Sequence, residues 1–180
     1  MILCINYVIW FLCVNLVFNN ILATLKFKNM TTVISRFLNI IMAGLLAGIL
    51  LGISLGYNPK NLSVSTYIEQ QQNVIKALNT LMPLLGLITI ILTLSSAFLQ
   101  KDNKIIFITL IIATIALVIT AFVTRFVNQP INSNVMIWNK ATLPTNWKEL
   151  RDKWWSFHLI RTIMTLTAFI LISLTAVRKN

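Results

Sequence analysis

The single histidine of the chain lies between a tryptophan and an arginine at helical spacing. Trp154, His158 and Arg161 stand at positions i, i+4 and i+7, so they share one face of a helix. A histidine is suited to taking a proton near neutral pH, and an arginine is suited to stabilising an oxyanion. The pattern therefore predicts a candidate base and a candidate anion-binding group on one face of this helix.

A cluster of uncharged amides around a proline follows a long apolar run. It comprises Arg125, Asn128, Gln129, Pro130, Asn132 and Asn134. Pro130 lacks a backbone donor and bends the chain, so we expect the third spanning helix to end here. Asn128 and Asn132 are then expected to bond the freed carbonyls, because an unpaired backbone group in lipid costs several kcal/mol. The alternative is that these amides form the wall of a ligand site.

The composition predicts a membrane protein. The chain has 180 residues, of which 57% are hydrophobic and 11% charged, whereas soluble domains carry about 25% charged residues. A spanning helix needs about 20 apolar residues. Four stretches meet or approach this length, at residues 34–56, 83–99, 105–127 and 159–177. We therefore predict an all-α membrane four-helix bundle, and we expect it in the bacterial inner (plasma) membrane. Basic residues in the connections favour both ends of this core inside.

The first 29 residues form a hydrophobic extension that has two interpretations. Residues 1–25 contain four asparagines and lack the basic segment that begins a signal peptide. They either form an additional transmembrane helix, or translation begins at Met30. In both cases the four-helix transmembrane domain is expected to occupy residues 30–180.

Small residues recur along the first core span. Glycines stand at every fourth position, as Gly44, Gly48, Gly52 and Gly56. Such a stripe lets a second backbone approach closely in lipid, where van der Waals contact drives helix association. We expect a packing surface for a neighbouring helix, with space for a flat ligand as the alternative.

The connection between the first two core spans is predicted to contain a helix. Asn58-Pro59 breaks the first span, and Ser63 or Ser65 is suited to cap a new helix that runs toward Pro83. Gln72, Lys76 and Asn79 fall on one face of it. These side chains either form a solvated face or point into the mouth of the bundle.

Tryptophans gather before the last span, at positions 138, 147, 154 and 155. Tryptophan is enriched at bilayer interfaces, so this tract is expected to lie on the membrane surface. Arg161 then lies about one turn inside the membrane, where a cation needs polar partners. We expect those partners to be Asn128, Asn132 and the face that carries Gln72 and Asn79.

Several kinds of site are disfavoured by the residue counts. One histidine and four acidic residues do not suggest a metal centre, so neither metal nor cofactor is expected. Cys4 and Cys13 lack zinc-ligand or redox-pair spacing. The net charge of +11 does not accompany a nucleic-acid module, and we assign it to membrane faces. The expected partners are membrane lipid and a lipophilic small molecule, with no nucleic acid; a homodimer is left open.

Two motifs resemble a known family. Asn128, Pro130 and Asn132 form an Asn-x-Pro-x-Asn pattern at the end of the third span. Trp154, Phe157, His158 and Arg161 form a Trp-x-x-aromatic-His-x-x-Arg pattern that opens the fourth. Together with the glycine-rich first span, they resemble the anthrone oxygenase-like group of small membrane proteins over about residues 34–177. This resemblance implies a four-helix membrane bundle. Some members oxidise anthrones to anthraquinones without an evident cofactor.

Two functional classes follow. The first is a cofactor-independent oxygenase for a lipophilic aromatic, with His158 and Arg161 as catalytic residues. The candidate substrate-binding residues are Asn128, Asn132, Trp154, Trp155, Gln72 and Asn79. The second is a non-catalytic membrane protein that binds a lipid or a quinone-like ligand at the same polar cluster. Four short spans leave little room for the alternating access that a transporter needs.

Overall fold

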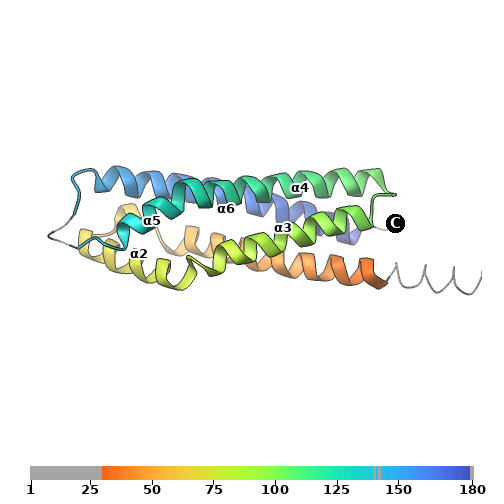
Figure 1. Ribbon diagram of the computed structural model, residues 1–180, viewed down its shortest axis with the longest axis horizontal. Helices are drawn as coiled ribbons and strands as arrows, with labels where there is room; N and C mark the ends of the chain where they lie inside the picture. The colour runs from red at the N-terminus through yellow and green to blue at the C-terminus, as the bar shows by residue number, and fades with distance from the viewer. Residues whose placement is uncertain (1–29, 140, 142, 179–180) are drawn as a thin grey trace, which may run out of the picture.

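The computed structural model describes residues 30–139, 141 and 143–178, and over these residues the chain is all-helical (Figure 1). The first helix occupies residues 30–56. It is followed by the short 3-10 helix η1 (Pro59–Asn61), α2 (Val64–Leu78), α3 (Leu81–Leu99) and α4 (Lys104–Val123). A π-helical turn, η2 (Thr124–Asn128), links α4 to α5 (Gln129–Val135), and α6 (Trp147–Val177) completes the bundle.

Within the described part of the chain, four helical segments are long and apolar enough to cross a membrane. They are Met30–Asn61, Leu81–Leu99, Lys104–Val135 and Trp147–Val177. The predicted all-α four-helix membrane bundle is therefore confirmed, and the chain is a multi-pass helical membrane protein. The proposed extra helix or alternative start concerns residues 1–29, which lie outside the described residues.

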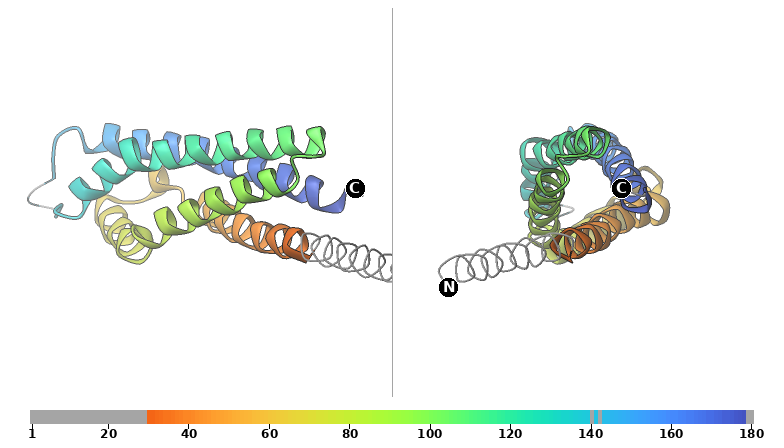
Figure 2. Two further views of the ribbon diagram at one scale, coloured as in Figure 1. Left: turned by 45° about the vertical axis from the view of Figure 1, so that its right-hand side comes forward. Right: turned by 90° about the vertical axis from the view of Figure 1, so that its right-hand side faces the viewer.

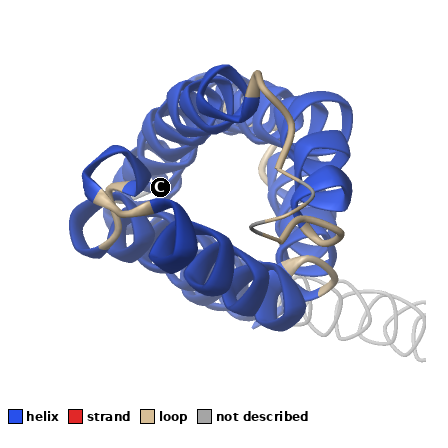
Figure 3. Cartoon of the chain, turned by 90° about the vertical axis from the view of Figure 1, so that its left-hand side faces the viewer, coloured by secondary structure: helices blue, strands red, loops and turns tan. Residues whose placement is uncertain are grey.

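The four spans form a closed ring, as the views along the bundle show (Figures 2 and 3). α4 packs against α3 on one side and α6 on the other. Ser35 of the first helix lies 2.7 Å from Ser96 of α3, and Thr93 donates to Asn39 over 2.8 Å. The first helix meets α6 where Ser54 Oγ lies 3.0 Å from Thr162 Oγ1. Hydrogen-bonded polar pairs thus help to hold helices together in a lipid environment that offers little hydrophobic driving force.

The spans differ in length, and the longer ones project beyond one end of α3. At about 1.5 Å per residue, the 19 residues of α3 reach about 28 Å, close to the hydrocarbon thickness of roughly 30 Å. The other helices continue past the start of α3, where η1, α2, α5 and residues 147–158 of α6 pack together (Figure 1). We call this end the cap. Its core contains Tyr67, Ile68, Ile75, Ile131, Val135, Trp138, Trp154 and Trp155.

The cap is held by polar contacts as well as by its apolar core. Ser63 caps α2 by accepting a bond from Thr66 N over 3.3 Å, so the first of the two predicted capping serines is the correct one. Gln72 donates to the carbonyls of Val135 and Trp138, each over 3.0 Å. These contacts tie α2 to the end of α5.

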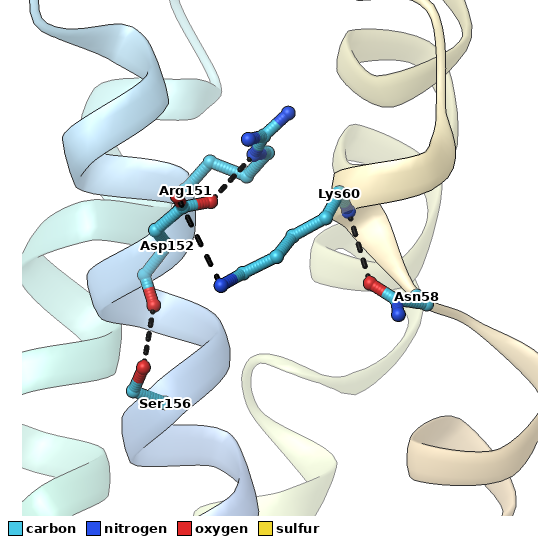
Figure 4. Close-up of polar contacts among 5 residues, drawn as sticks. All are labelled: Asn58, Lys60, Arg151, Asp152 and Ser156. Atoms are coloured by element: carbon cyan, nitrogen blue, oxygen red, sulfur yellow. Dashed lines mark hydrogen bonds and ion pairs between the residues drawn. The ribbon is translucent and has the colours of Figure 1, made fainter.

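A cluster of three charged side chains joins η1 to α6 (Figure 4). Asp152 accepts from Arg151 Nε over 2.9 Å and lies 3.9 Å from Lys60 Nζ. Lys60 and Asp152 are both substantially exposed, and exposed ion pairs contribute only ~0–1 kcal/mol. This group therefore fixes orientation more than it adds stability.

The expectation that the third span ends at Pro130 is wrong. The helix continues through η2 into α5, with Pro130 in the first turn of α5. In the π turn the Gln129 N–H bonds the carbonyl of Thr124, five residues back. Pro130 follows this turn directly and is placed where a missing backbone donor is tolerated. The connection to α6 therefore begins after Val135 and ends before Trp147.

The expected packing role of the glycine stripe is wrong over most of its length. A Cβ atom built on Gly48, Gly52 or Gly56 would meet nothing within 4 Å. Only Gly44 has a close neighbour, the Phe169 ring at 3.3 Å. The packed face of the first helix is instead formed by Ala43, Leu46, Ala47 and Leu50. Periodicity alone does not reveal which face of the first helix packs against the bundle.

Candidate functional site

Arg161 lies on α6 where the bundle meets the cap, and only 8% of it is exposed. Its Nη2 atom lies 3.0 Å from His158 Nδ1, and its Nη1 atom donates to Thr124 Oγ1 over 3.3 Å. The guanidinium carbon Cζ lies over the Trp154 ring, 5.9 Å from its centroid. The buried Nε–H has no hydrogen-bond partner among the described residues. Of the five N–H donors of Arg161, the buried Nε–H is therefore one that still needs an acceptor.

The hydrogen bond with Arg161 fixes the tautomer of His158. A guanidinium has only donors, so Nδ1 of His158 must accept. Nε2 then carries the proton and donates to Ser54 Oγ over 3.0 Å. The imidazole is fully buried and stacks on Trp154 at 5.2 Å, with the rings parallel to within 1°. Trp155 stacks on it at 5.5 Å. His158 is thus held in one orientation by every group that surrounds it.

The positive charge of Arg161 is not neutralised by a carboxylate. Its hydrogen-bond partners are an imidazole and a hydroxyl, and it makes no ion pair within the described part of the chain. Burying a cation without a partner is costly, so the arrangement favours binding of an anion nearby. Among the described residues no three His, Cys, Asp or Glu side chains gather to hold a metal ion.

A cavity of about 200 Å³ lies beside Arg161. Its walls come from the first helix, α3, α4, η2, α5 and α6. The lining residues are Leu46, Leu50, Met82, Pro83, Gly86, Leu87, Ile90, Leu117, Thr120, Ala121, Thr124, Arg125, Gln129 and Arg161. The walls are mostly apolar, with a few polar groups at one end, which is the usual composition of a small-molecule site. We call this the main cavity.

A smaller cavity of about 30 Å³ adjoins the same arginine on the side of the cap. Asn79, Asn132 and Trp154 are among its lining residues. Trp154 Nε1 donates to Asn132 Oδ1 over 2.8 Å, and Asn132 Nδ2 donates to Asn79 Oδ1 over 3.0 Å. This chain of amides fixes the edge of the Trp154 indole beside the guanidinium.

The structure brings some of the predicted site residues together and separates others. Arg161, Trp154, Asn132 and Asn79 line one cavity, while His158 lies behind Arg161. Asn128 is fully buried and donates to the Trp154 carbonyl over 3.1 Å, leaving its own Oδ1 without a partner among the described residues.

Two further predicted site residues have other contacts. Trp155 stacks on His158, and Gln72 bonds the end of α5. Neither residue lines the main cavity or the smaller one. Their assignment as substrate-binding residues remains a prediction.

Arg161 has different partners from those expected. The amides of Asn128 and Asn132 bond Trp154 and Asn79, whereas His158 and Thr124 bond the guanidinium. Sequence reasoning missed Thr124, as well as Thr120 on the cavity wall and Ser54 beside His158. One signal in the sequence could have found them. Thr120 and Thr124 stand four residues apart near the cap end of one apolar span, and Ser54 stands near the cap end of another.

Comparison with family models identifies a family for this chain. The family model described as anthrone oxygenase matches residues 72–171, from within α2 to near the end of α6. The match includes Asn132, Trp154, His158 and Arg161. Neither the curated proteins nor the solved structures gave a significant match.

Proposed function

The chain belongs to the anthrone oxygenase family, and we propose that it is an integral membrane oxygenase for a lipophilic aromatic that ionises to an enolate. The observation that carries this proposal is the state of Arg161. It is a buried cation on the wall of an apolar cavity, it has no carboxylate partner among the described residues, and its Nε–H is unsatisfied. An anionic oxygen on a hydrophobic body complements each of these properties.

The proposed reaction begins with a methylene group placed between aryl rings and conjugated with a carbonyl. Loss of one proton gives an anion whose charge is shared between that carbon and the carbonyl oxygen. The carbon then bonds to one atom of dioxygen, and uptake of a proton gives a hydroperoxide. Elimination of water leaves a new carbonyl. The carbon loses four electrons and dioxygen gains four, with one oxygen atom in the product and one in water.

Each residue near the cavity has a proposed part in this sequence. Arg161 holds the developing oxyanion, because a preorganised cation in a water-poor site stabilises such charge strongly. Trp154 lines the smaller cavity and holds the His158 ring by stacking, and Asn132 orients its indole through the N–H. His158 is the proposed proton acceptor. Its Nδ1 lone pair is released when the substrate oxygen draws the Arg161 guanidinium toward the cavity.

A second function uses the same cavity without chemistry. The main cavity is lined by lipid-exposed residues such as Leu87 and Ala121 as well as by buried ones. The exposed lining supports, as the second candidate, a non-catalytic protein in which Arg161 binds the head group of a lipid or a quinone-like molecule. We place either function in the bacterial inner (plasma) membrane, with membrane lipid as the surrounding partner.

Oxygen consumption by the purified protein separates the two functions. The full chain in phosphatidylcholine nanodiscs is mixed with an anthrone, and empty nanodiscs provide the rate of uncatalysed oxidation. The oxygenase proposal predicts consumption of one dioxygen per anthraquinone formed, at a rate far above the empty discs. A rate equal to that of the empty discs, with an anthraquinone still bound by the protein, would favour the binding function.

A further inference from the structure

A second arginine lines the main cavity on the side that faces lipid. Arg125 lies in η2, and its side chain is exposed. Its Nη1 atom donates to Gln129 Oε1 over 3.4 Å, and both side chains line the cavity that Arg161 closes at its buried end. The weak bond to Gln129 leaves most of the Arg125 donors free for another acceptor.

The main cavity passes from the core of the bundle to its flank between α3 and α4. Leu50 and Leu117 are each only 2% exposed, whereas Leu87 and Ala121 belong to the exposed surface. Gly86 marks this opening, because a Cβ atom added there would meet nothing within 4 Å. The opening lies near the cap end of α3, about one turn from its start. A ligand dissolved in the bilayer therefore has access from the side.

The charges on the cavity wall have one sign. Arg161 and Arg125 both line it, no carboxylate does, and most of the remaining lining is apolar. The two cations come from different helices, one buried and one at the surface. This pattern matches a rigid hydrophobic body that carries an oxygen function at each of two positions.

We propose that Arg125 and Gln129 form a second oxygen subsite at the lipid-side mouth of the main cavity, and that the substrate enters from the bilayer there. The ligand class is an apolar aromatic with one oxygen at Arg161 and a second anionic group, preferably a carboxylate, at Arg125. This inference rests on the proposed function, in which Arg161 holds the reacting oxygen. A guanidinium recognises a carboxylate through two parallel hydrogen bonds, which explains an arginine at this position.

The competing account makes Arg125 an interfacial residue that reaches lipid phosphates, as arginines near helix ends often do. That account predicts no dependence of ligand affinity on Arg125. The two accounts therefore differ in a binding measurement.

Two probes of the same shape distinguish the accounts. Anthraquinone-2-carboxylate and unsubstituted anthraquinone are titrated into the full chain in phosphatidylcholine nanodiscs, and tryptophan fluorescence reports binding. Arg125→Gln should weaken the carboxylate about tenfold, because it removes a charged hydrogen-bond partner, and should leave anthraquinone unchanged. Arg125→Lys should recover part of the loss. Gln129→Leu should weaken the carboxylate a few fold, and serves if Arg125→Gln does not fold.

A matched glycine pair tests the lateral opening. Gly86→Leu fills the mouth of the cavity, whereas Gly52→Leu adds the same side chain at an equally open position outside it. The proposal predicts loss of binding of both probes in Gly86→Leu and wild-type affinity in Gly52→Leu.

The outcomes separate this inference from the function on which it rests. Equal carboxylate affinity in wild type, Arg125→Gln and Gln129→Leu overturns the second subsite and leaves Arg161 untouched. Full binding by Gly86→Leu overturns the opening between α3 and α4. If wild type binds neither probe, the second subsite is overturned for this ligand class, while anthrone turnover in the oxygen assay would still support the proposed function.

Discussion

Arg161 and His158 share one hydrogen bond, 3.0 Å long, between Nη2 of the guanidinium and Nδ1 of the imidazole. Because the other imidazole nitrogen faces Ser54, His158 has no free lone pair while this bond exists. The proposed anion-binding group and the proposed base are therefore coupled. In the proposed mechanism, movement of Arg161 toward a ligand oxygen makes His158 available as a proton acceptor.

Replacement of His158 by asparagine tests this coupling. His158→Asn keeps an acceptor for Arg161 but removes the basic nitrogen. We expect the dissociation constant for anthraquinone to change by less than about threefold, and kcat for an anthrone to fall by roughly 10²-fold or more, the usual contribution of a general base. Wild-type kcat in this variant would show that His158 only positions Arg161.

The indole of Trp154 should be tied to Asn132 by a measurable pair interaction. Trp154→Phe removes the 2.8 Å bond to Asn132 Oδ1 and retains an aromatic ring to stack on His158. We expect a loss of about 1 kcal/mol of stability, and a similar loss for Asn132→Ala. In the double variant the losses should be less than additive. Strict additivity in thermal unfolding would mean that the bond contributes nothing.

Two glycines of the first helix should respond in opposite ways. Gly48→Leu adds a side chain where nothing lies within 4 Å, so the melting temperature should not fall. Gly44→Leu presses on the Phe169 ring, already 3.3 Å from a Cβ at that position, and overpacking costs about 1–3 kcal/mol. Equal melting temperatures for the two variants would contradict the described packing of the first helix on α6.

Two tyrosines in the cap differ in hydrogen bonding. Tyr57 donates to Gln71 Oε1 over 2.7 Å, whereas the buried Tyr67 hydroxyl has no partner among the described residues. Burial raises the pKa of Tyr67, so its hydroxyl stays protonated. Tyr57→Phe should therefore lower the melting temperature, and Tyr67→Phe should leave it unchanged or raise it. A larger loss in Tyr67→Phe would indicate an acceptor for that hydroxyl beyond the described residues.

The membrane architecture was readable from the sequence because lipid imposes long uncharged helices. Each of the four spans begins or ends within a few residues of a predicted limit, and the length of α3 matches the bilayer thickness. The continuation of the third span into α5 was not predicted, because Pro130 is ordinarily a helix breaker. The helix accommodates Pro130 because a π turn precedes it, and no single residue in the sequence predicts that turn.

Sequence reasoning predicted the contact within one helix of the site and missed the contacts between helices. Arg161 and His158 are three residues apart on one helix, so their proximity follows from helical geometry alone. Thr124 reaches Arg161 only because α4 packs against α6. The partners of Asn128 and Asn132 likewise depend on how the cap folds over the bundle. Side-chain pairing between helices is set by rotation about each helix axis, which periodicity does not determine.

The rate of anthrone oxidation by Arg161→Gln tests the central claim most directly. The variant and wild type are compared in nanodiscs at equal protein concentration, with melting temperatures measured on the same samples. Arg178→Gln, which changes an exposed arginine outside both cavities, serves as a charge-matched control. If Arg161 holds the oxyanion, kcat/KM should fall by roughly 10²–10³-fold, the usual cost of removing one such donor, while the control keeps turnover of an anthrone that has no second anionic group. A folded Arg161→Gln variant with wild-type kcat/KM would contradict the account.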